Sequence, residues 1–130
     1  MKKLQVLFIL VMLTTGAMAQ SGSKKIEVLY FKANLSCCQA RACQNLENVT
    51  KEIITKNFPA KEVVFKTVAL TDEANKKLVE TYNAKSQTLI ILNNKKNKFV
   101  NLSASLAKYA RDNDKDAYEK DLITNIKALK

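Results

Sequence analysis

The chain has 130 residues and a formal net charge of +10, from 22 lysines and arginines against 12 acidic residues. Only Arg41 and Arg111 are arginines, and the lysines are dispersed, unlike the clustered arginines and interleaved aromatics of nucleic-acid-binding surfaces. The sequence has no histidine, so hydrolase chemistry based on a Cys–His pair is excluded. We therefore expect a solvated lysine-rich surface and no nucleic-acid partner.

The first 19 residues have the three parts of a secretory signal peptide. Met1-Lys2-Lys3 is a positive n-region, residues 6–13 are apolar, and Ala17-Met18-Ala19 has the small-x-small pattern of a cleavage site. The apolar run is shorter than the roughly 20 residues that a membrane anchor needs, and no second long run follows. We expect cleavage after Ala19, a periplasmic or secreted bacterial protein, and no membrane span in the mature chain.

The remaining sequence predicts a flexible polar lead-in at residues 20–25 and one domain at residues 26–130. In chain order the predicted elements are a strand at 26–32, a helix at 37–57, a strand at 63–70, a helix at 71–82, strands at 88–92 and 98–102, and helices at 105–110 and 116–129. Phe58-Pro59 ends the first helix, and Thr71-Asp72-Glu73 begins the second with a capping hydroxyl and first-turn acids.

This order, β-α-β-α-β-β-α, predicts an α/β domain with a mixed four-stranded sheet. Residues 26–32 and 88–92 are almost continuously apolar, as in strands that are buried on both faces. Strands separated by helices are expected to pair in parallel, and the final hairpin to add an antiparallel edge.

Three cysteines, Cys37, Cys38 and Cys43, stand close together, and the rest of the sequence has none. An exported protein enters an oxidising compartment, where disulfides form. With an odd number of cysteines, at least one thiol stays free or pairs with another molecule. Structural disulfides stabilise by closing long loops, and this cluster closes almost none. The cluster therefore indicates thiol chemistry rather than a disulfide scaffold.

The cysteines lie where a strand gives way to a helix. Ser36-Cys37-Cys38-Gln39 fits a capping box with Ser36 as the N-cap, which places the adjacent cysteines in the first turn. The helix N-terminus and Arg41, one turn on, are expected to lower the pKa of a thiol there from its ordinary value of about 8.5. Glu47, one turn beyond Cys43, is interpreted as a solvated helix acid outside the site.

The element order, with cysteines at the first strand-to-helix junction, resembles the thioredoxin fold over residues 26–129. The local likeness is best in Val28-Leu29-Tyr30-Phe31 and in residues 82–92, which are similar to the segment from a tyrosine to the third strand of thioredoxins. The resemblance implies a thioredoxin-like three-layer sandwich, redox-active cysteines, no cofactor, and substrates that carry thiols or disulfides. Family members carry Cys-x-x-Cys and a cis-proline before the third strand, where this chain has Gln87.

Our leading hypothesis is a thiol–disulfide oxidoreductase in which Cys37 or Cys38 is the nucleophile and Cys43 resolves the mixed disulfide. In a regular helix Cys38 and Cys43 are about 7.5 Å apart along the axis and point about 140° apart. That geometry forbids a disulfide. Either the helix begins late, near Arg41 to Cys43, or its first turn unwinds on oxidation. We expect a monomer that uses a redox partner protein.

Two alternatives remain open. The first is a binding protein that holds Cu(I) or As(III) through thiolates, which the absence of the family's cis-proline favours. The second is a thiol peroxidase, because Cys38 to Cys43 resembles the Cys-x4-Cys arrangement of some peroxiredoxins. No Pro-x-x-x-Thr-x-x-Cys approach precedes the pair, and without histidine or a second cysteine cluster we expect no tetrahedral zinc site.

Overall fold

The computed structural model describes residues 26–34 and 37–130, with backbone alone at Cys37 and Cys38. The predicted signal peptide, the lead-in at residues 20–25 and the Ser36 cap lie outside the described residues. The elements are β1 (Ile26–Lys32), α1 (Cys37–Asn57), β2 (Val63–Ala69), a 3-10 turn (Glu73–Asn75), α2 (Lys76–Thr81), β3 (Leu89–Asn93), β4 (Lys98–Asn101), α3 (Ser103–Asp112) and α4 (Lys115–Leu129). The predicted order of helices and strands is confirmed, with small shifts at the ends.

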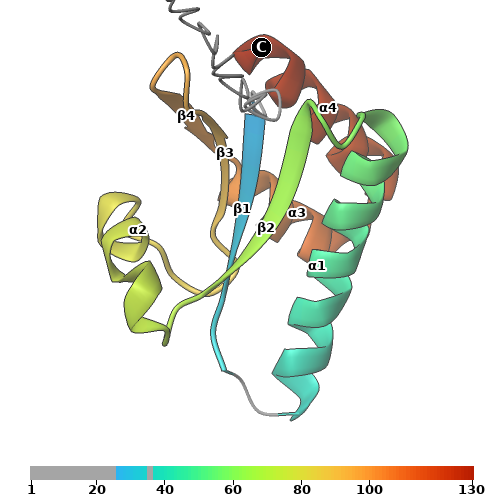
Figure 1. Cartoon of the computed structure of the whole chain (residues 1–130). Helices are drawn as coiled ribbons and strands as arrows, with labels where there is room; N and C mark the ends of the chain where they lie inside the picture. The colour runs from blue at the N-terminus through green and yellow to red at the C-terminus, as the bar shows by residue number, and fades with distance from the viewer. Residues whose placement is uncertain (1–25, 35–36) are drawn as a thin grey trace, which may run out of the picture.

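The described strands form one mixed sheet in the order β2-β1-β3-β4, which confirms an α/β fold with a mixed four-stranded sheet. β1 and β2 are parallel, with Ile26 opposite Val63. β3 pairs antiparallel with both β1 and β4. Helix α1 begins at the end of the sheet where β1 ends (Figure 1).

The expectation that strands separated by helices pair in parallel is wrong for β3. The predicted helix at 71–82 is a 3-10 turn followed by the six residues of α2. Six helical residues span about 9 Å, whereas a seven-residue strand spans about 23 Å. α2 alone does not span the length of β2, and β3 starts near the end of the sheet where β2 finishes and runs back (Figure 1).

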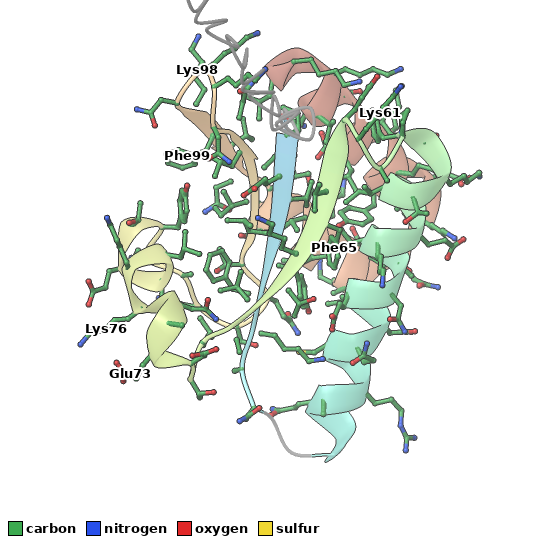
Figure 2. The ribbon with its side chains drawn as sticks, viewed as in Figure 1. Lys61, Phe65, Glu73, Lys76, Lys98 and Phe99 are labelled. Carbon is green, nitrogen blue, oxygen red and sulfur yellow. The ribbon has the colours of Figure 1, made fainter. Side chains whose placement is uncertain are left out.

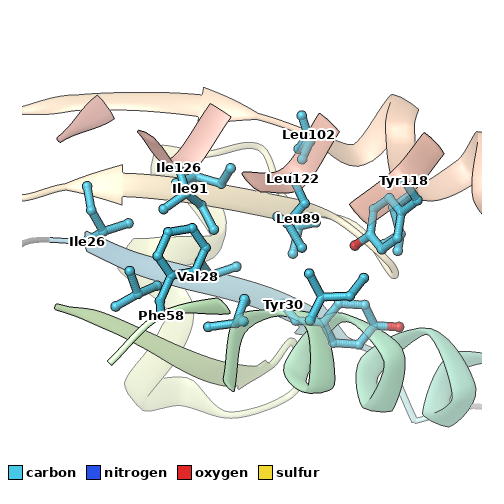
Figure 3. Close-up of a cluster of buried hydrophobic side chains, with 14 of the residues drawn as sticks. Ile26, Val28, Tyr30, Phe58, Leu89, Ile91, Leu102, Tyr118, Leu122 and Ile126 are labelled. Atoms are coloured by element: carbon cyan, nitrogen blue, oxygen red, sulfur yellow. The ribbon is translucent and has the colours of Figure 1, made fainter. Parts of the chain in front are cut away.

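Apolar side chains cover both faces of the two central strands. Val28 and Tyr30 of β1 join a cluster with residues of α1, α3 and α4, whereas Leu29 and Phe31 join a second cluster with residues of α2. Figure 3 shows the larger cluster, with Ile26, Val28, Tyr30, Phe58, Leu89, Ile91, Leu102, Tyr118, Leu122 and Ile126 labelled. The continuous apolar runs in the sequence therefore correspond to strands with helices on both faces.

The polar break at residues 112–114 separates two helices, as predicted. Asn113 takes the left-handed conformation that often ends a helix, with φ of 55°. The Asp114 carboxylate then accepts a hydrogen bond from the Ala117 amide at 3.0 Å and caps α4. The break lets α3 and α4 pack side by side on the face that α1 also covers.

Lysine side chains are dispersed over the surface of the protein. Lys61, Lys76 and Lys98 lie on different sides of the molecule (Figure 2). Phe99 is 54% exposed and lies edge-on against Tyr82, on the α2 side of the sheet. The distribution of these lysines agrees with the dispersed charge of the sequence.

Candidate functional site

The cysteine cluster lies at the start of the 21-residue helix α1. The helix begins at Cys37, so Cys37 and Cys38 stand in its first turn and Cys43 in its second. The first turn carries no acidic residue, which leaves the positive end of the helix dipole uncompensated by a carboxylate. Arg41, the expected source of positive charge, is exposed.

The expectation of a late helix start near Arg41 to Cys43 is wrong. Since α1 is helical from Cys37, Cys38 and Cys43 are separated by five rises, about 7.5 Å along the axis. Disulfides need Cα atoms within about 7 Å and converging Cβ vectors. A disulfide from either first-turn cysteine to Cys43 therefore requires the first turn to unwind.

Cys43 is a free thiol, buried in the protein with 1% of its surface exposed. Its sulfur accepts a hydrogen bond from Nε2 of Gln87 at 3.0 Å. Its carbonyl oxygen accepts a second hydrogen bond, also 3.0 Å, from the buried hydroxyl of Tyr30. Burial, followed by the Cys43 and Glu47 side chains, raises the pKa of Tyr30, so its hydroxyl remains a donor at neutral pH.

Gln87 belongs to the loop before β3 and lies beside α1. Its backbone is in the left-handed region, with φ of 66°. The backbone N–H of Gln87 donates to the Phe31 carbonyl at 2.9 Å, and the backbone N–H of Phe31 donates to the Thr88 carbonyl at 2.9 Å. These two hydrogen bonds hold the loop against β1 at Gln87 and Thr88. They therefore hold the Cα atom of Gln87 in place, from which its side chain extends.

Two clefts adjoin the Cys43–Gln87 contact, and both are lined by Ala42 and Gln87. One, of about 180 Å³, extends along α1 toward Tyr109 and Asn113 of the α3–α4 region. The other opens toward the start of α1, where Gln39 and Ser86 complete its lining. The Ser86 hydroxyl is buried and makes no hydrogen bond within the described part of the chain. Cys43 itself lines neither cleft, in agreement with its burial.

Glu47 is not the solvated acid that the sequence suggested, since only 13% of its side chain is exposed. Its carboxylate accepts from Lys32 at 2.8 Å and from Thr67 at 2.6 Å. Burial alone would raise the pKa of Glu47, but these hydrogen bonds and the Lys32 charge outweigh burial and hold that pKa below its ordinary value. The Glu47 carboxylate thus links α1 to β1 and β2, and it makes no described contact with the Cys43 sulfur.

The site thus contains one residue whose role the sequence did not reveal. Gln87 stands 44 positions after Cys43, and its contact depends on how the loop crosses the end of β1. The signal available was its place before the third strand, where the resembled family has proline. Cys43 was identified by residue type and spacing, but its burial was not.

Comparisons with known proteins add no family to this picture. No protein-family model matches the sequence, and a search of curated proteins finds no significant match. Within residues 26–34 and 37–130, no helix is long and apolar enough to cross a membrane. No group of three or more potential metal-ligating side chains occurs among those described, which exclude the thiols of Cys37 and Cys38.

Proposed function

We propose that the chain is an exported, thioredoxin-like thiol–disulfide oxidoreductase of the periplasm or the extracellular space. The observation that carries this proposal is the placement of Cys43: a buried, free sulfur with an amide donor, one turn behind two cysteines that begin a helix. The β-α-β-α-β-β-α order and the helices on both faces of the sheet support a thioredoxin-like three-layer sandwich.

The proposed reaction passes two electrons from the protein to a substrate disulfide. The thiolate of Cys37 or Cys38 attacks one substrate sulfur, the substrate S–S bond breaks, and one substrate thiolate leaves. Cys43 then attacks the mixed disulfide, forms a bond to the first cysteine and releases the second substrate thiolate. Each released thiolate takes up a proton, and the reverse sequence oxidises a substrate dithiol.

Two features of the site suit this sequence. Cys37 and Cys38 begin α1, whereas Cys43 is buried, as suits a resolving thiol that should not react with substrates directly. The resembled family has its second cysteine three positions after the first, where this chain has Ala40 or Arg41. Because Cys43 lies deeper in α1, resolution requires the first turn to open.

Trapping of the mixed disulfide tests the proposal. The Cys43→Ser variant of the mature protein, incubated with oxidised glutathione, should accumulate one stable glutathione adduct on Cys37 or Cys38. The wild-type protein should release that adduct as its own disulfide forms. Ala42→Ser, which adds a hydroxyl beside Cys43, is the matched control and should behave as wild type. Equal adduct levels in wild type and Cys43→Ser would contradict a resolving role for Cys43.

Two further measurements separate the alternatives. A thiol peroxidase would consume hydrogen peroxide rapidly, and its activity would disappear in Cys38→Ser. A soft-metal protein would bind Cu(I) in a fixed ratio that depends on all three thiols, with no disulfide exchange. Neither behaviour is expected of the oxidoreductase.

A further inference from the structure

Gln87 gives Cys43 a hydrogen-bond donor from a distant part of the chain. Nε2 of Gln87 lies 3.0 Å from the Cys43 sulfur, which is 1% exposed. Gln87 also lines two clefts on this side of α1. Its side chain therefore contacts a sulfur that solvent does not reach.

The left-handed backbone of Gln87 indicates that a specific side-chain contact is the reason for glutamine at this position. Left-handed backbone is unfavourable for residues with a Cβ, and Asn is one of the few that tolerate it, because its side chain bonds locally. Of the four described residues with positive φ, Asn83, Asn97 and Asn113 follow this rule, and Gln87 is the exception. Asn or Gly at position 87 would satisfy the backbone conformation. The longer side chain of glutamine is therefore explained by its hydrogen bond to the Cys43 sulfur.

We propose that Gln87 is a positioning residue for Cys43, an inference that rests on the proposed function in which Cys43 is the resolving thiol. In thiol–disulfide exchange the attacking and leaving sulfurs carry the negative charge. The Gln87 N–H, held by the pinned loop, is aimed at the Cys43 sulfur, so it stabilises charge there when Cys43 attacks or leaves.

The hydrogen bond is made to the free Cys43 thiol. A disulfide sulfur is a weaker hydrogen-bond acceptor than a thiol or thiolate sulfur, so the contact favours the reduced form. Loss of the donor should therefore favour the disulfide. For the loss of one hydrogen bond, we expect the equilibrium constant with glutathione to move by up to about tenfold, or ~30 mV, toward the disulfide.

Two substitutions and one matched control test this. Gln87→Met keeps a side chain of similar length and removes the donor without adding a charge, and Gln87→Gly removes the side chain while relieving the left-handed backbone. Asn83→Gly relieves the same backbone conformation elsewhere in the loop and leaves the Cys43 contact in place. Each protein is equilibrated across a glutathione redox series, and its thiols are counted by mass spectrometry. Both Gln87 variants should shift by up to about tenfold toward the disulfide, and Asn83→Gly should not shift.

A second measurement is independent of redox chemistry. In a protein carrying Cys37→Ser and Cys38→Ser, Cys43 is the one remaining thiol. In that protein Gln87→Met should slow alkylation of Cys43 by iodoacetamide several-fold, because the thiolate is the reactive form and its hydrogen-bond donor is lost. If wild type forms a Cys43 disulfide but the Gln87 variants have the same equilibrium constant, the inference is wrong and the proposed function stands. If wild type forms no disulfide, the proposed function fails, and an unchanged alkylation rate would then show that Gln87 does not hold Cys43 either.

Discussion

The hydroxyl of Tyr30, within β1, donates a 3.0 Å hydrogen bond to the carbonyl oxygen of Cys43 in the second turn of α1. Both residues are buried, so the contact joins the sheet to the helix at the level of the Cys43 thiol. The first turn of α1 lies before this contact and carries the other two cysteines. We therefore expect the first turn to move in exchange while Cys43 and the rest of α1 stay in place.

Removal of the Tyr30 hydroxyl tests this anchor. Tyr30→Phe should lower the free energy of unfolding by about 1 kcal/mol, the net value of one buried hydrogen bond. Urea unfolding of the reduced protein measures it. Tyr82→Phe is the control, because the Tyr82 hydroxyl makes no hydrogen bond among the described residues and should cost little. Equal effects of the two substitutions would contradict the anchoring role.

The buried tyrosines predict a loss of stability in alkali. Burial is the main cause that raises the pKa of Tyr118 above its ordinary value, and its hydroxyl lies 2.7 Å from that of Thr50. The unfolded chain releases this proton above about pH 10 while the folded protein keeps it, so stability falls as pH rises past that point. Urea unfolding of Tyr118→Phe from pH 8 to pH 11 should give a shallower fall than wild type. Parallel curves would contradict the assignment.

Glu47 predicts the opposite dependence in acid. Its pKa is lowered in the folded protein, so its stabilising contribution is present above the ordinary glutamate value of about 4.3 and is lost as pH falls through the folded value. Glu47→Gln should reduce stability by about 1 kcal/mol at neutral pH, where the Lys32 and Thr67 contacts are intact. The difference from wild type should shrink toward pH 2, measured by urea unfolding. A difference that is independent of pH would be evidence against the ion pair.

Oxidation should unwind only the first turn of α1. The Arg41 and Ala42 amides are the first that can donate to carbonyls of this turn, so their hydrogen-exchange protection should disappear in the disulfide form. Amides from Leu46 onward should keep theirs, because the helix there packs on the core. Hydrogen exchange followed by NMR measures both groups. Unchanged protection at Arg41 and Ala42 in fully oxidised protein would rule out unwinding.

Much of the fold could be predicted because its signals are local. The continuous apolar runs at Ile26–Lys32 and Leu89–Asn93 reflect burial on two faces, and the caps at Asn113 and Asp114 reflect backbone needs of neighbouring residues. The direction of β3 could not be predicted, since it depends on the path of the whole segment between β2 and β3 rather than on the apolar pattern of the strand. The apolar pattern of residues 71–82 does not distinguish a full helix from a 3-10 turn and a short one.

The cysteines of the candidate site could be found in the sequence, but their contacts could not. Three cysteines in one cluster indicate thiol chemistry by residue type. The burial of Cys43 and its bond to Gln87 arise from tertiary packing between α1 and a loop 44 positions away. Gln87 is also not a residue type that signals left-handed backbone, unlike Asn83, so its conformation has no local sign in the sequence.

Thiol counting by mass spectrometry on the mature protein, across a glutathione redox series with and without Cu(I), tests the central claim most directly. The account predicts one reversible disulfide that joins Cys43 to Cys37 or Cys38, with a defined midpoint that shows which direction of exchange is favoured. The absence of a disulfide at every glutathione ratio, with all three thiols protected together by Cu(I), would contradict it and indicate a metal-binding protein.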